Sequence, residues 1–490
     1  MKVLFVLPDM IKQESLGVMI LSACLKKENH ITKVTYYNHP DFLNVVRSFS
    51  PDIIAYSITT GMHYALIKKN MELKEKIGGF FSIFGGPHAT FFPQIIEKYE
   101  GIDAVCIGEG EKAFILLANR LQNGDDISQI NNLWLRTGEG IVKNPLGELI
   151  ENLDELPFYD RRIFPENDKI IKESSTRHIM FSRGCPYSCT YCFNRGYKKI
   201  TRGKGRLLRV MSVSRAIAEL KHLLNEVPEV NFIEFHDDIF PFSQKETFEE
   251  FYELYKKEIG IKFFCYPLLK GRNFDFMKRL KDMGCFWVAI GFETANEDIR
   301  KNILKRPNYN NQDVLEMVHN CRKAGLKIMT TNLVGLPVEN SLNNDIKTLK
   351  FNLKMKPTLA LSYILYPYPG TEIAEYAIEK GYYPQDAELT INTKTDSPLT
   401  FKNESKLLIE KNALMFGIIV DFPFLIFFQK FLLMLPKKFL SIVYFIHRGY
   451  KLRVTLSANH SLKELLNNVF SLFSYLKYIR TEKKMAISKR

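Results

Sequence analysis

The sequence RGCPYSCTYCFN, residues 183–194, places three cysteines in the spacing C-x3-C-x2-C. One loop therefore supplies the three thiolates of Cys185, Cys189 and Cys192. Iron–sulfur clusters are normally held by four cysteines, so three ligands leave one iron free to bind something else. We expect an iron–sulfur cluster with an open iron position at this loop.

Two other uses of closely spaced cysteines fit this chain poorly. Structural zinc sites take four ligands from paired motifs, and no second C-x2-C or H-x3-H motif follows the loop. A disulfide framework suits a short secreted chain, whereas this chain has 8 cysteines in 490 residues and no apolar signal segment over residues 1–8. The remaining cysteines stand singly and are expected to be small buried residues: Cys24, Cys106, Cys265, Cys285 and Cys321. A low-potential cluster also predicts a reducing, oxygen-poor cytoplasm.

The loop resembles the signature of the radical S-adenosylmethionine (SAM) superfamily, including the aromatic Tyr191 directly before the third cysteine. The resemblance implies a 4Fe-4S cluster on Cys185, Cys189 and Cys192, whose open iron chelates the amino acid end of SAM. It also implies reductive cleavage of SAM to a 5′-deoxyadenosyl radical. Such chemistry needs an external electron donor, such as flavodoxin or ferredoxin.

Length and charge limit the possible partners. A chain of 490 residues, 46% of them hydrophobic, predicts two to four domains. The net charge of +14 is concentrated near the end, because residues 401–490 contain 16 Lys or Arg and 5 Asp or Glu. The first 400 residues carry only the remaining +3. Because the basic surplus is confined to a tail rich in Phe, Leu and Ile, no nucleic-acid partner is expected.

The first 130 residues alternate apolar strands with helical patterns. The candidate strands are residues 3–7, 34–37, 53–57, 81–84 and 104–107. Continuous apolar strands separated by helices predict a parallel, doubly wound, Rossmann-like sheet. Ligands bind beyond the carboxyl ends of the strands in such sheets. Turns rich in glycine or small hydroxyl residues stand there, at residues 57–61, 85–90 and 108–111.

Together these turns resemble the cobalamin-binding domain of cobalamin-dependent radical SAM enzymes. The turns Gly-Gly-Pro-His-Ala-Thr and Gly-Glu-Gly-Glu match that subfamily, and residues 16–19 at the start of the first helix also fit. The resemblance implies that cobalamin contacts Ser57, Thr59, Gly85, Gly86, Pro87, His88, Gly108 and Glu109. The Asp-x-His-x-x-Gly element that supplies a cobalt ligand in mutases is absent, and His63 and His88 are the nearby histidines. The expected cobalamin therefore has no protein histidine on its lower face, and some relatives keep the sheet without the cofactor.

Residues 131–173 are turn-rich and polar, and they predict a linker. Beyond them the strand–helix alternation resumes with a longer repeat. The candidate strands are residues 178–182, 231–236, 262–266, 287–293, 326–333 and 359–365. Six strands in βα order predict a partial (β/α)6 barrel, with active residues at the carboxyl ends of its strands.

Residues at those carboxyl ends resemble the SAM-binding elements of the superfamily. The resemblance assigns SAM binding to Tyr191, Asp237, Asp238, Glu293, Gly335 and Pro337. Many radical enzymes have a Gly-Gly-Glu turn where this chain has Asp237 and Asp238, and the aspartate pair resembles the substitute found in the cobalamin subfamily. A helix cap or a solvated turn is the alternative for each aspartate. Arg206 and Arg209 match an arginine-bearing stretch of the family or form a solvated basic loop.

Residues 386–490 predict an α-helical, basic and apolar C-terminal region. Within residues 412–448, Asp421 and Pro423 interrupt the longest apolar run. A membrane-spanning helix needs ~20 mostly apolar residues, and a central Asp costs roughly 2.5–3.5 kcal/mol, so a span is disfavoured. Docking at an anionic membrane surface, where each nearby Lys or Arg adds about 1 kcal/mol, is one alternative. A helical cap on the open side of the barrel, or an oligomer contact, is the other.

The predicted enzyme is a cobalamin-dependent radical SAM methyltransferase that methylates an unactivated carbon. Its predicted parts are residues 1–130 for cobalamin, 131–173 as linker, 174–385 as radical SAM barrel and 386–490 as helical region. Radical ring formation or oxidation, as in anaerobic porphyrin cyclases of the same subfamily, would use the same two domains. RNA methylthiolation is less favoured because that family carries three further cysteines in its first domain and a terminal RNA-binding barrel. A noncatalytic cobalamin carrier is disfavoured by the intact cysteine loop, and no catalytic side chain is assigned.

Overall fold

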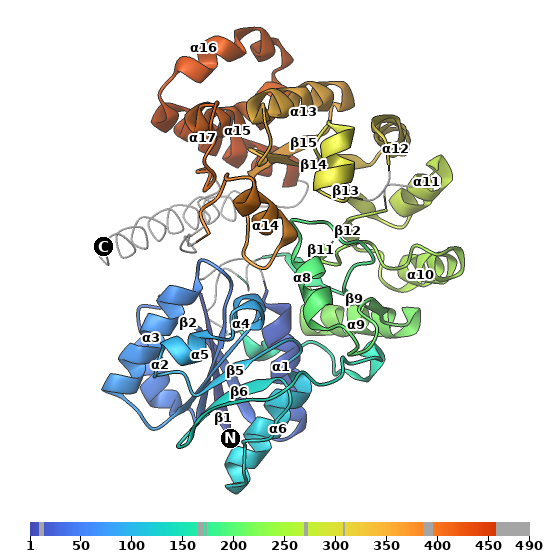
Figure 1. Cartoon of the computed structure of the whole chain (residues 1–490). Helices are drawn as coiled ribbons and strands as arrows, with labels where there is room; N and C mark the ends of the chain where they lie inside the picture. Colours follow the sequence, from blue (N-terminus) through green and yellow to red (C-terminus); the bar gives the residue numbers. More distant parts are fainter. Residues whose placement is uncertain are drawn as a thin grey trace.

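The computed structural model describes residues 1–8, 14–164, 171, 174–268, 273–306, 309–385 and 395–456. The chain is an α/β protein with an N-terminal seven-stranded sheet, a six-stranded parallel sheet and a helical C-terminal region. Figure 1 shows the N-terminal sheet at the bottom of the molecule and the C-terminal helices at the top. The fold class predicted from the sequence is confirmed.

The N-terminal sheet has the strand order β2-β1-β3-β4-β5-β6-β7. Its parallel strands are β1 Lys2–Leu7, β2 Ile31–Tyr36, β3 Ile53–Ser57, β4 Phe81–Gly85 and β5 Ala104–Cys106. The connecting helices are α1 Leu16–Lys27, α2 Phe42–Phe49, α3 His63–Lys76, α4 Pro87–Phe91, α5 Ile95–Lys98 and α6 Glu111–Asn123. Successive residues of β1 enter two different cores, with Val3 and Phe5 in one and Leu4 and Val6 in the other. Both faces of the sheet are therefore buried, as expected for a doubly wound sheet.

Two further strands extend this sheet into the stretch that the sequence predicted to be a linker. β6 Leu133–Thr137 pairs antiparallel with β5, and β7 Gly140–Lys143 pairs antiparallel with β6. Leu133 and Leu135 are buried in one core, whereas Trp134 packs on the opposite one, so apolar side chains of β6 point to both faces of the sheet. In the described residues between β7 and position 164, the connection forms the 3-10 turns η1 Leu153–Glu155 and η2 Arg161–Ile163.

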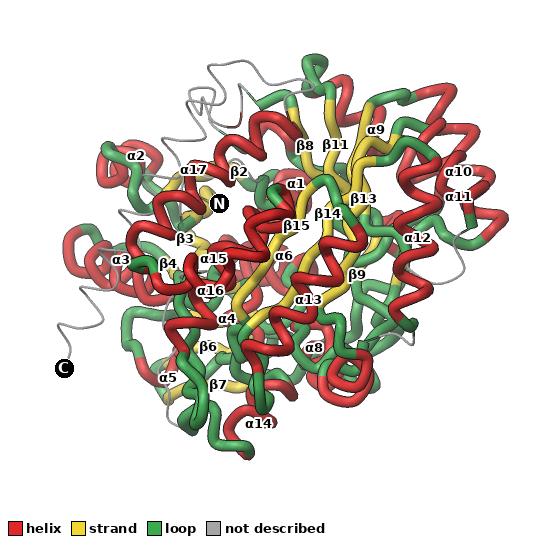
Figure 2. Tube along the Cα trace, turned by 90° about the horizontal axis from the view of Figure 1, so that it is seen from above, coloured by secondary structure: helices red, strands yellow, loops and turns green. Residues whose placement is uncertain are grey.

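The second sheet has the order β15-β14-β13-β12-β11-β8 and is parallel throughout. Its strands are β8 Thr176–Ile179, β11 Phe232–Phe235, β12 Lys262–Cys265, β13 Cys285–Glu293, β14 Lys327–Val334 and β15 Leu359–Ile364. The helices are α8 Phe193–Ile200, α9 Val213–Glu226, α10 Lys245–Glu258, α11 Phe274–Asp282, α12 Asn311–Lys323, α13 Ser341–Met355 and α14 Glu372–Glu379, with a π-helical turn η3 Ile299–Ile303. A short antiparallel pair, β9 Ser182–Arg183 and β10 Arg209–Val210, precedes and follows the cysteine loop. Figure 2 shows the strands side by side, with α10, α11 and α12 along one side, as in the predicted partial barrel.

The first C-terminal helix, α15 Lys406–Asp421, packs against the edge strand β15 and against α13. Gly417 permits this close approach, because an added Cβ would lie 2.9 Å from the Ala360 carbonyl oxygen of β15. Ser362 Oγ donates a hydrogen bond to the Ala413 carbonyl at 2.8 Å. This helix is therefore a packed cap that covers the edge of the sheet.

The elements after α15 are η4 Pro423–Phe428, α16 Gln429–Met434 and α17 Lys437–Leu456. Their outer faces carry exposed apolar side chains, and Phe427 is 86% exposed. We call this set the aromatic patch: Phe422, Phe424, Phe427, Phe428, Phe431, Met434, Phe439, Ile442, Ile446 and Tyr450. Within the described part of the chain, no helix has the length and apolarity needed to cross a membrane.

Candidate functional site

The three cysteines of the C-x3-C-x2-C loop line one cavity of about 220 Å³ at the carboxyl ends of the barrel strands, which we call the cluster cavity. The loop starts at Gly184, whose φ is +83°, and an added Cβ there would collide with the Leu207 carbonyl. Burial raises the pKa of Cys185 to about 12 and also raises the pKa of Cys192. These thiols therefore hold their protons until a metal displaces them. The donor set fits an iron–sulfur cluster with three protein ligands.

Beside the cysteines lies a pair of oppositely charged side chains, Glu293 and Arg306. The Tyr191 hydroxyl donates a hydrogen bond to Glu293 Oε1 at 3.0 Å, and Arg306 Nη2 lies 3.7 Å from the same oxygen. Burial raises the pKa of Glu293, although Arg306 and the Tyr191 hydrogen bond oppose the shift. Arg306 Nη1 is 3.8 Å from Cys189 Sγ, and Arg306 Nε is buried without a hydrogen-bond partner among the described residues. The pair matches the ammonium and carboxylate of an amino acid, so the residues present fit the amino acid end of SAM.

Sequence analysis missed Arg306. It follows η3, far from the cysteines along the chain, and it belongs to none of the motifs. Only the folding of the loop after β13 brings its guanidinium beside Cys189.

The two aspartates after β11 occupy different surroundings. Asp238 Oδ2 accepts a hydrogen bond from Asn194 Nδ2 at 2.8 Å, and that nitrogen lies 3.8 Å from Cys192 Sγ. Asp237 instead accepts hydrogen bonds from the Phe181 backbone N–H at 3.0 Å and from the Ser182 hydroxyl. Burial raises the pKa of Asp237 to about 7. Asp238 lines the cluster cavity, whereas Asp237 braces the segment that leads into the cysteine loop.

Gly335 and Pro337 are buried, and neither is among the described residues that line the cluster cavity. The Gly335 N–H donates to Asp345 Oδ2 at 3.0 Å, and its φ of +65° places it where an added Cβ would lie 3.1 Å from Ile409 of α15. Their assignment to SAM stays a prediction.

A second cavity of about 480 Å³ lies between the carboxyl edge of the N-terminal sheet and the cysteine loop, and we call it the interdomain cavity. Six of the residues predicted to contact cobalamin line it, namely Ser57, Gly85, Gly86, Pro87, Gly108 and Glu109. Gly86 has a φ of +92°, and an added Cβ would lie 3.0 Å from the Ile58 carbonyl oxygen. The wall is thus largely backbone and small side chains, as close approach of a planar macrocycle requires. The residues present fit a cobalamin.

The other two predicted cobalamin contacts, Thr59 and His88, are not among the described residues that line this cavity. Thr59 is exposed, and the buried His88 ring stacks on His63 with ring centroids 3.7 Å apart. Burial lowers the pKa of His63 to about 3 and that of His88 to about 4, so both rings are neutral. His88 Nδ1 is 3.0 Å from the Thr60 hydroxyl. This placement favours a structural histidine pair, and a cobalt without a protein histidine stays a prediction.

Buried ion pairs join the two domains beside the interdomain cavity. Glu109 Oε1 lies 3.0 Å from Arg183 Nη1 and 2.8 Å from Arg209 Nη2. Arg183 also pairs with Glu111 at 2.5 Å. Arg206, by contrast, is exposed and pairs with Glu151 at 3.1 Å. Arg209 therefore forms a buried ion pair between the domains, whereas Arg206 forms an ion pair at the surface.

A third cavity of about 520 Å³, the barrel chamber, lies against the inner face of the strands. Most of its wall is apolar and consists of Phe232, Phe264, Trp287, Met329, Leu359 and Leu361. Arg448 of α17 closes one side, where its Nη1 donates to the Tyr444 hydroxyl at 2.7 Å. Asp238 lines the barrel chamber, the cluster cavity and the interdomain cavity, so the three spaces meet at this side chain.

Two family models match the chain. The model described as Radical SAM superfamily matches residues 179–349, and the model described as B12 binding domain matches residues 12–118. The first match runs from the end of β8 into α13, and the second runs from just before α1 into α6.

Two curated relatives and one solved structure align with most of the chain. An uncharacterized methyltransferase of Pyrococcus horikoshii is 29% identical over 397 residues, which are 77% of this chain and 83% of the relative. The hopanoid C-3 methylase of Methylococcus capsulatus is 26% identical over 377 residues, which are 74% of this chain and 68% of the relative. Among solved structures, the radical SAM methyltransferase TsrM from Kitasatospora setae, with cobalamin and a 4Fe-4S cluster bound, aligns with a TM-score of 0.63. It is 16% identical and the alignment covers 79% of this chain and 76% of TsrM, which shows a shared fold.

Proposed function

Because this chain belongs to the cobalamin-dependent radical S-adenosylmethionine enzymes, we propose that it methylates a carbon atom of an apolar substrate held in the barrel chamber. The single observation that carries the proposal is the position of Asp238, where the three cavities meet. A substrate carbon near this residue would be reachable from the cysteine loop and from the interdomain cavity alike.

The proposed roles of the protein side chains follow from their contacts. Cys185, Cys189 and Cys192 would hold the cluster, and the pair Glu293–Arg306 would hold the amino acid end of SAM. Bound together, the cluster, SAM and cobalamin supply hydrogen-atom abstraction and a methyl group, which is chemistry that the side chains alone lack. The apolar strand residues of the chamber would orient the substrate and exclude water.

An apolar substrate is supported by the chamber wall and by one relative. Four of the wall residues, Phe264, Trp287, Met329 and Leu361, come from four different strands and present apolar surface. The relative named hopanoid C-3 methylase acts, by its name, on a lipid. We therefore propose a polycyclic or isoprenoid lipid as the substrate class.

The test is product analysis with SAM carrying a deuterated methyl group. Anaerobically reconstituted enzyme, with flavodoxin or ferredoxin as the proposed electron donor, is incubated with a hopanoid-containing lipid extract, and tryptophan serves as a polar comparison. A lipid that gains the labelled methyl group, with both 5′-deoxyadenosine and S-adenosylhomocysteine released, supports the proposal. Release of 5′-deoxyadenosine together with an oxidised or cyclised product that carries no added methyl group would overturn methylation. The activity would then be radical ring formation or oxidation.

We also propose that the aromatic patch docks on an anionic bilayer. Exposed Lys430 and Lys438 lie among its aromatic side chains, and the basic surplus of residues 401–490 has the sign that anionic lipids attract. On α17, Ile442 and Ile446 face outward, whereas Arg448 reaches the barrel chamber. One helix thus separates the proposed membrane surface from the proposed substrate site.

Vesicle sedimentation tests the docking. The wild-type protein is expected to sediment with vesicles of phosphatidylcholine and phosphatidylserine and to be released by salt, because salt screens the attraction. The double change Lys430→Glu and Lys438→Glu should weaken binding by at least about tenfold, since each basic residue near the surface contributes about 1 kcal/mol. Lys437 is left unchanged because it pairs with Asp396 and Glu410.

The matched control reverses two exposed lysines on the N-terminal domain, Lys76→Glu and Lys112→Glu, and should bind like the wild type. If the protein ignores these vesicles at low salt, the patch is not a membrane surface. Self-association that disappears in a Phe427→Ser variant would instead identify the patch as a contact between copies of the chain.

A further inference from the structure

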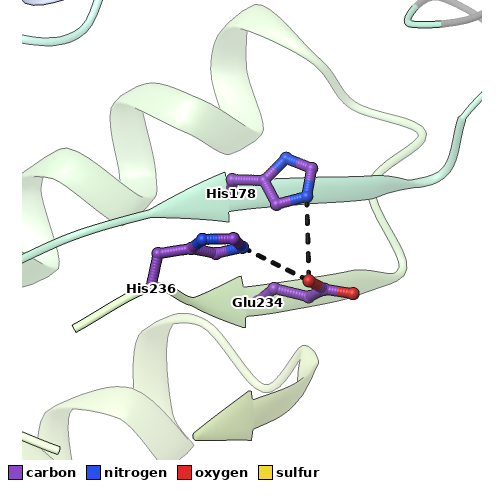
Figure 3. A group of neighbouring side chains, drawn as sticks. All are labelled: His178, Glu234 and His236. Atoms are coloured by element: carbon purple, nitrogen blue, oxygen red, sulfur yellow. Dashed lines mark hydrogen bonds and ion pairs between the residues drawn. The ribbon is translucent and has the colours of Figure 1, made fainter. Parts of the chain in front are cut away.

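Three potential metal ligands converge on the inner face of the barrel, on the opposite edge of the sheet from α15. They are His178 of β8, Glu234 of β11 and His236, which follows β11 directly, and Figure 3 shows their side chains turned toward one another. Their ligand atoms all lie within 4.8 Å of one another. No element of the cluster, SAM or cobalamin sites uses these side chains.

The register of the sheet produces this grouping. In the parallel pair of β8 and β11, His178 is the direct partner of Glu234. Residues 234 and 236 point to the same face because side chains alternate along an extended strand. The three side chains are therefore held together by the backbone of two neighbouring strands.

The separations from Glu234 are close to those of ligands on one ion, with the His236 pair inside the expected range and the His178 pair just above it. His178 Nε2 lies 3.7 Å and His236 Nε2 lies 3.3 Å from Glu234 Oε2. Ligand atoms bound at about 2.0–2.2 Å to a single ion in tetrahedral or octahedral geometry are separated by about 3.0–3.6 Å. We propose that His178, Glu234 and His236 bind a divalent first-row transition-metal ion, Zn²⁺ or Fe²⁺.

The far side of His178 is braced as metal-binding histidines are. His178 Nδ1 lies 3.4 Å from both the backbone nitrogen and the Oε2 atom of Glu14, and that carboxylate oxygen also accepts the His178 backbone N–H at 2.8 Å. Arg161 Nη1 lies 3.0 Å from Glu14 Oε2 and also donates to the His178 carbonyl at 2.9 Å. Metal binding through Nε2 requires the tautomer in which Nδ1–H donates to the Glu14 carboxylate, the arrangement in which an outer carboxylate orients a metal-binding histidine.

Three protein ligands leave coordination positions open. Glu234 and His236 line the barrel chamber, so the open positions face the space proposed for the substrate. Two histidines and one carboxylate form the ligand set of catalytic zinc sites and of mononuclear nonhaem iron sites. The ion would bind an oxygen of the substrate, a hydroxyl or a carboxylate, and so anchor an otherwise apolar molecule. This last step rests on the proposed function, whereas the metal site itself does not.

Metal uptake can be measured without substrate and without turnover. Anaerobically reconstituted wild-type enzyme is dialysed against buffer with Zn²⁺ or, in a second arm, Fe²⁺, and its metals are counted by mass spectrometry. We expect one zinc ion per chain in the first arm, or one iron beyond the cluster irons in the second. Failure of methyl transfer would leave this measurement unaffected.

Three variants locate the site. Glu234→Gln and His236→Asn should each lose the additional ion and keep the visible absorption of the cluster. Glu14→Gln should weaken the affinity for Zn²⁺ by about 10- to 100-fold, as loss of an outer carboxylate does. The matched control His319→Asn, at an exposed histidine of α12, should bind metal like the wild type.

A second readout covers variants that reconstitute poorly. Zn²⁺ should raise the unfolding temperature of the wild-type protein, because a ligand that binds only the folded state stabilises it, and should leave His236→Asn unchanged. Equal zinc content in the wild type and Glu234→Gln would overturn the proposal. So would a wild-type protein that takes up neither ion and gains no thermal stability, which would identify the trio as a hydrogen-bonded brace between β8 and β11.

Discussion

Arg183, two residues before the first cysteine of the loop, pairs with Glu109 in the turn after β5, with Nη1 and Oε1 3.0 Å apart. The cluster loop is thereby tied to the wall of the interdomain cavity. The same carboxylate holds Arg209. Burial raises the pKa of Glu109, but the Arg209 hydrogen bond and the charges of both arginines outweigh it, so the pKa is lowered. One carboxylate therefore fixes the distance between the two proposed cofactor sites.

Removing Arg209 should destabilise the joint between the domains. In Arg209→Met, the buried Glu109 keeps its charge with one partner fewer, and breaking a buried ion pair costs about 3–5 kcal/mol. The side chain of Arg209 is 1% exposed, so solvent does not screen this pair. Anaerobic thermal unfolding should show a lower midpoint, and hydrogen exchange should speed up at Ile150, whose N–H donates to Glu109.

The matched control is Arg206→Met. Arg206 is 80% exposed and pairs with Glu151 on the surface, where such a pair contributes about 0–1 kcal/mol. Equal effects of the two substitutions would show that Glu109 does not clamp the domains.

Each cysteine of the loop should be indispensable for the cluster. Cys185→Ala, Cys189→Ala and Cys192→Ala should each abolish the cluster absorption and the formation of 5′-deoxyadenosine, since two thiolates cannot hold the cluster in place of three. Cys265→Ala, at a buried cysteine of β12, should keep both and lose roughly 1 kcal/mol of stability. An active Cys189→Ala enzyme would rule out the radical mechanism.

Filling the interdomain cavity should exclude cobalamin. Gly17 lines this cavity on α1, and an added Cβ there would meet nothing within 4 Å, so Gly17→Phe places a ring in the cavity without straining the backbone. Anaerobic reconstitution should give a protein with its cluster and severalfold less cobalt. Gly86 is a poorer choice because its positive φ would strain the turn as well.

Gly138→Phe is the control for this change. Gly138 stands in the exposed turn between β6 and β7, and an added Cβ there also meets nothing within 4 Å. This variant should bind cobalamin like the wild type. Normal cobalt content in Gly17→Phe would mean that cobalamin does not occupy the interdomain cavity.

Asp237 should make stability depend on pH near neutrality. Burial raises its pKa from 3.8 to about 7, so the folded protein keeps a proton that the unfolded chain releases between these values. The free energy of unfolding should therefore fall as pH rises from about 4 to about 7, by about 1.4 kcal/mol per unit of pKa separation, and then level off. Asp237→Asn keeps an oxygen that can accept the Phe181 N–H, and it should flatten this slope.

Unfolding midpoints of the wild type and Asp237→Asn at pH 5.5 and 8 measure the effect. Asp298→Asn, at an exposed aspartate after β13, should retain the wild-type slope. An unchanged slope in Asp237→Asn would show that Asp237 is already ionised at the lower pH.

Local patterns were sufficient to predict the parallel strands of both sheets and the cysteine loop. The apolar run over residues 53–57 matches β3 at both ends. The three cysteines of the C-x3-C-x2-C motif are close in the sequence, so their grouping in one loop depends on no long-range contact. The hairpin β6–β7 was missed because its strands are short and stand in a stretch that is otherwise rich in turns and polar residues.

Contacts between distant segments could not be predicted. Arg306 reaches Cys189 across 117 positions of the chain, and nothing in its neighbourhood distinguishes it from a surface arginine. The different surroundings of Asp237 and Asp238 depend on which strand end each faces, and the sequence assigns both to the same turn. The pairing register of β8 and β11 brings together His178, Glu234 and His236. The positions of these residues in the sequence do not predict that register.

The position of α17 has a consequence for how this architecture can change. Arg448 forms part of the chamber wall, yet it belongs to a segment that contributes no cysteine and no glycine turn. Exchange of the chain after β15 would therefore alter the shape and charge of the chamber without altering the groups proposed to bind the cluster or cobalamin. New substrate preferences could arise by replacing one terminal segment while the reactive centre is inherited unchanged.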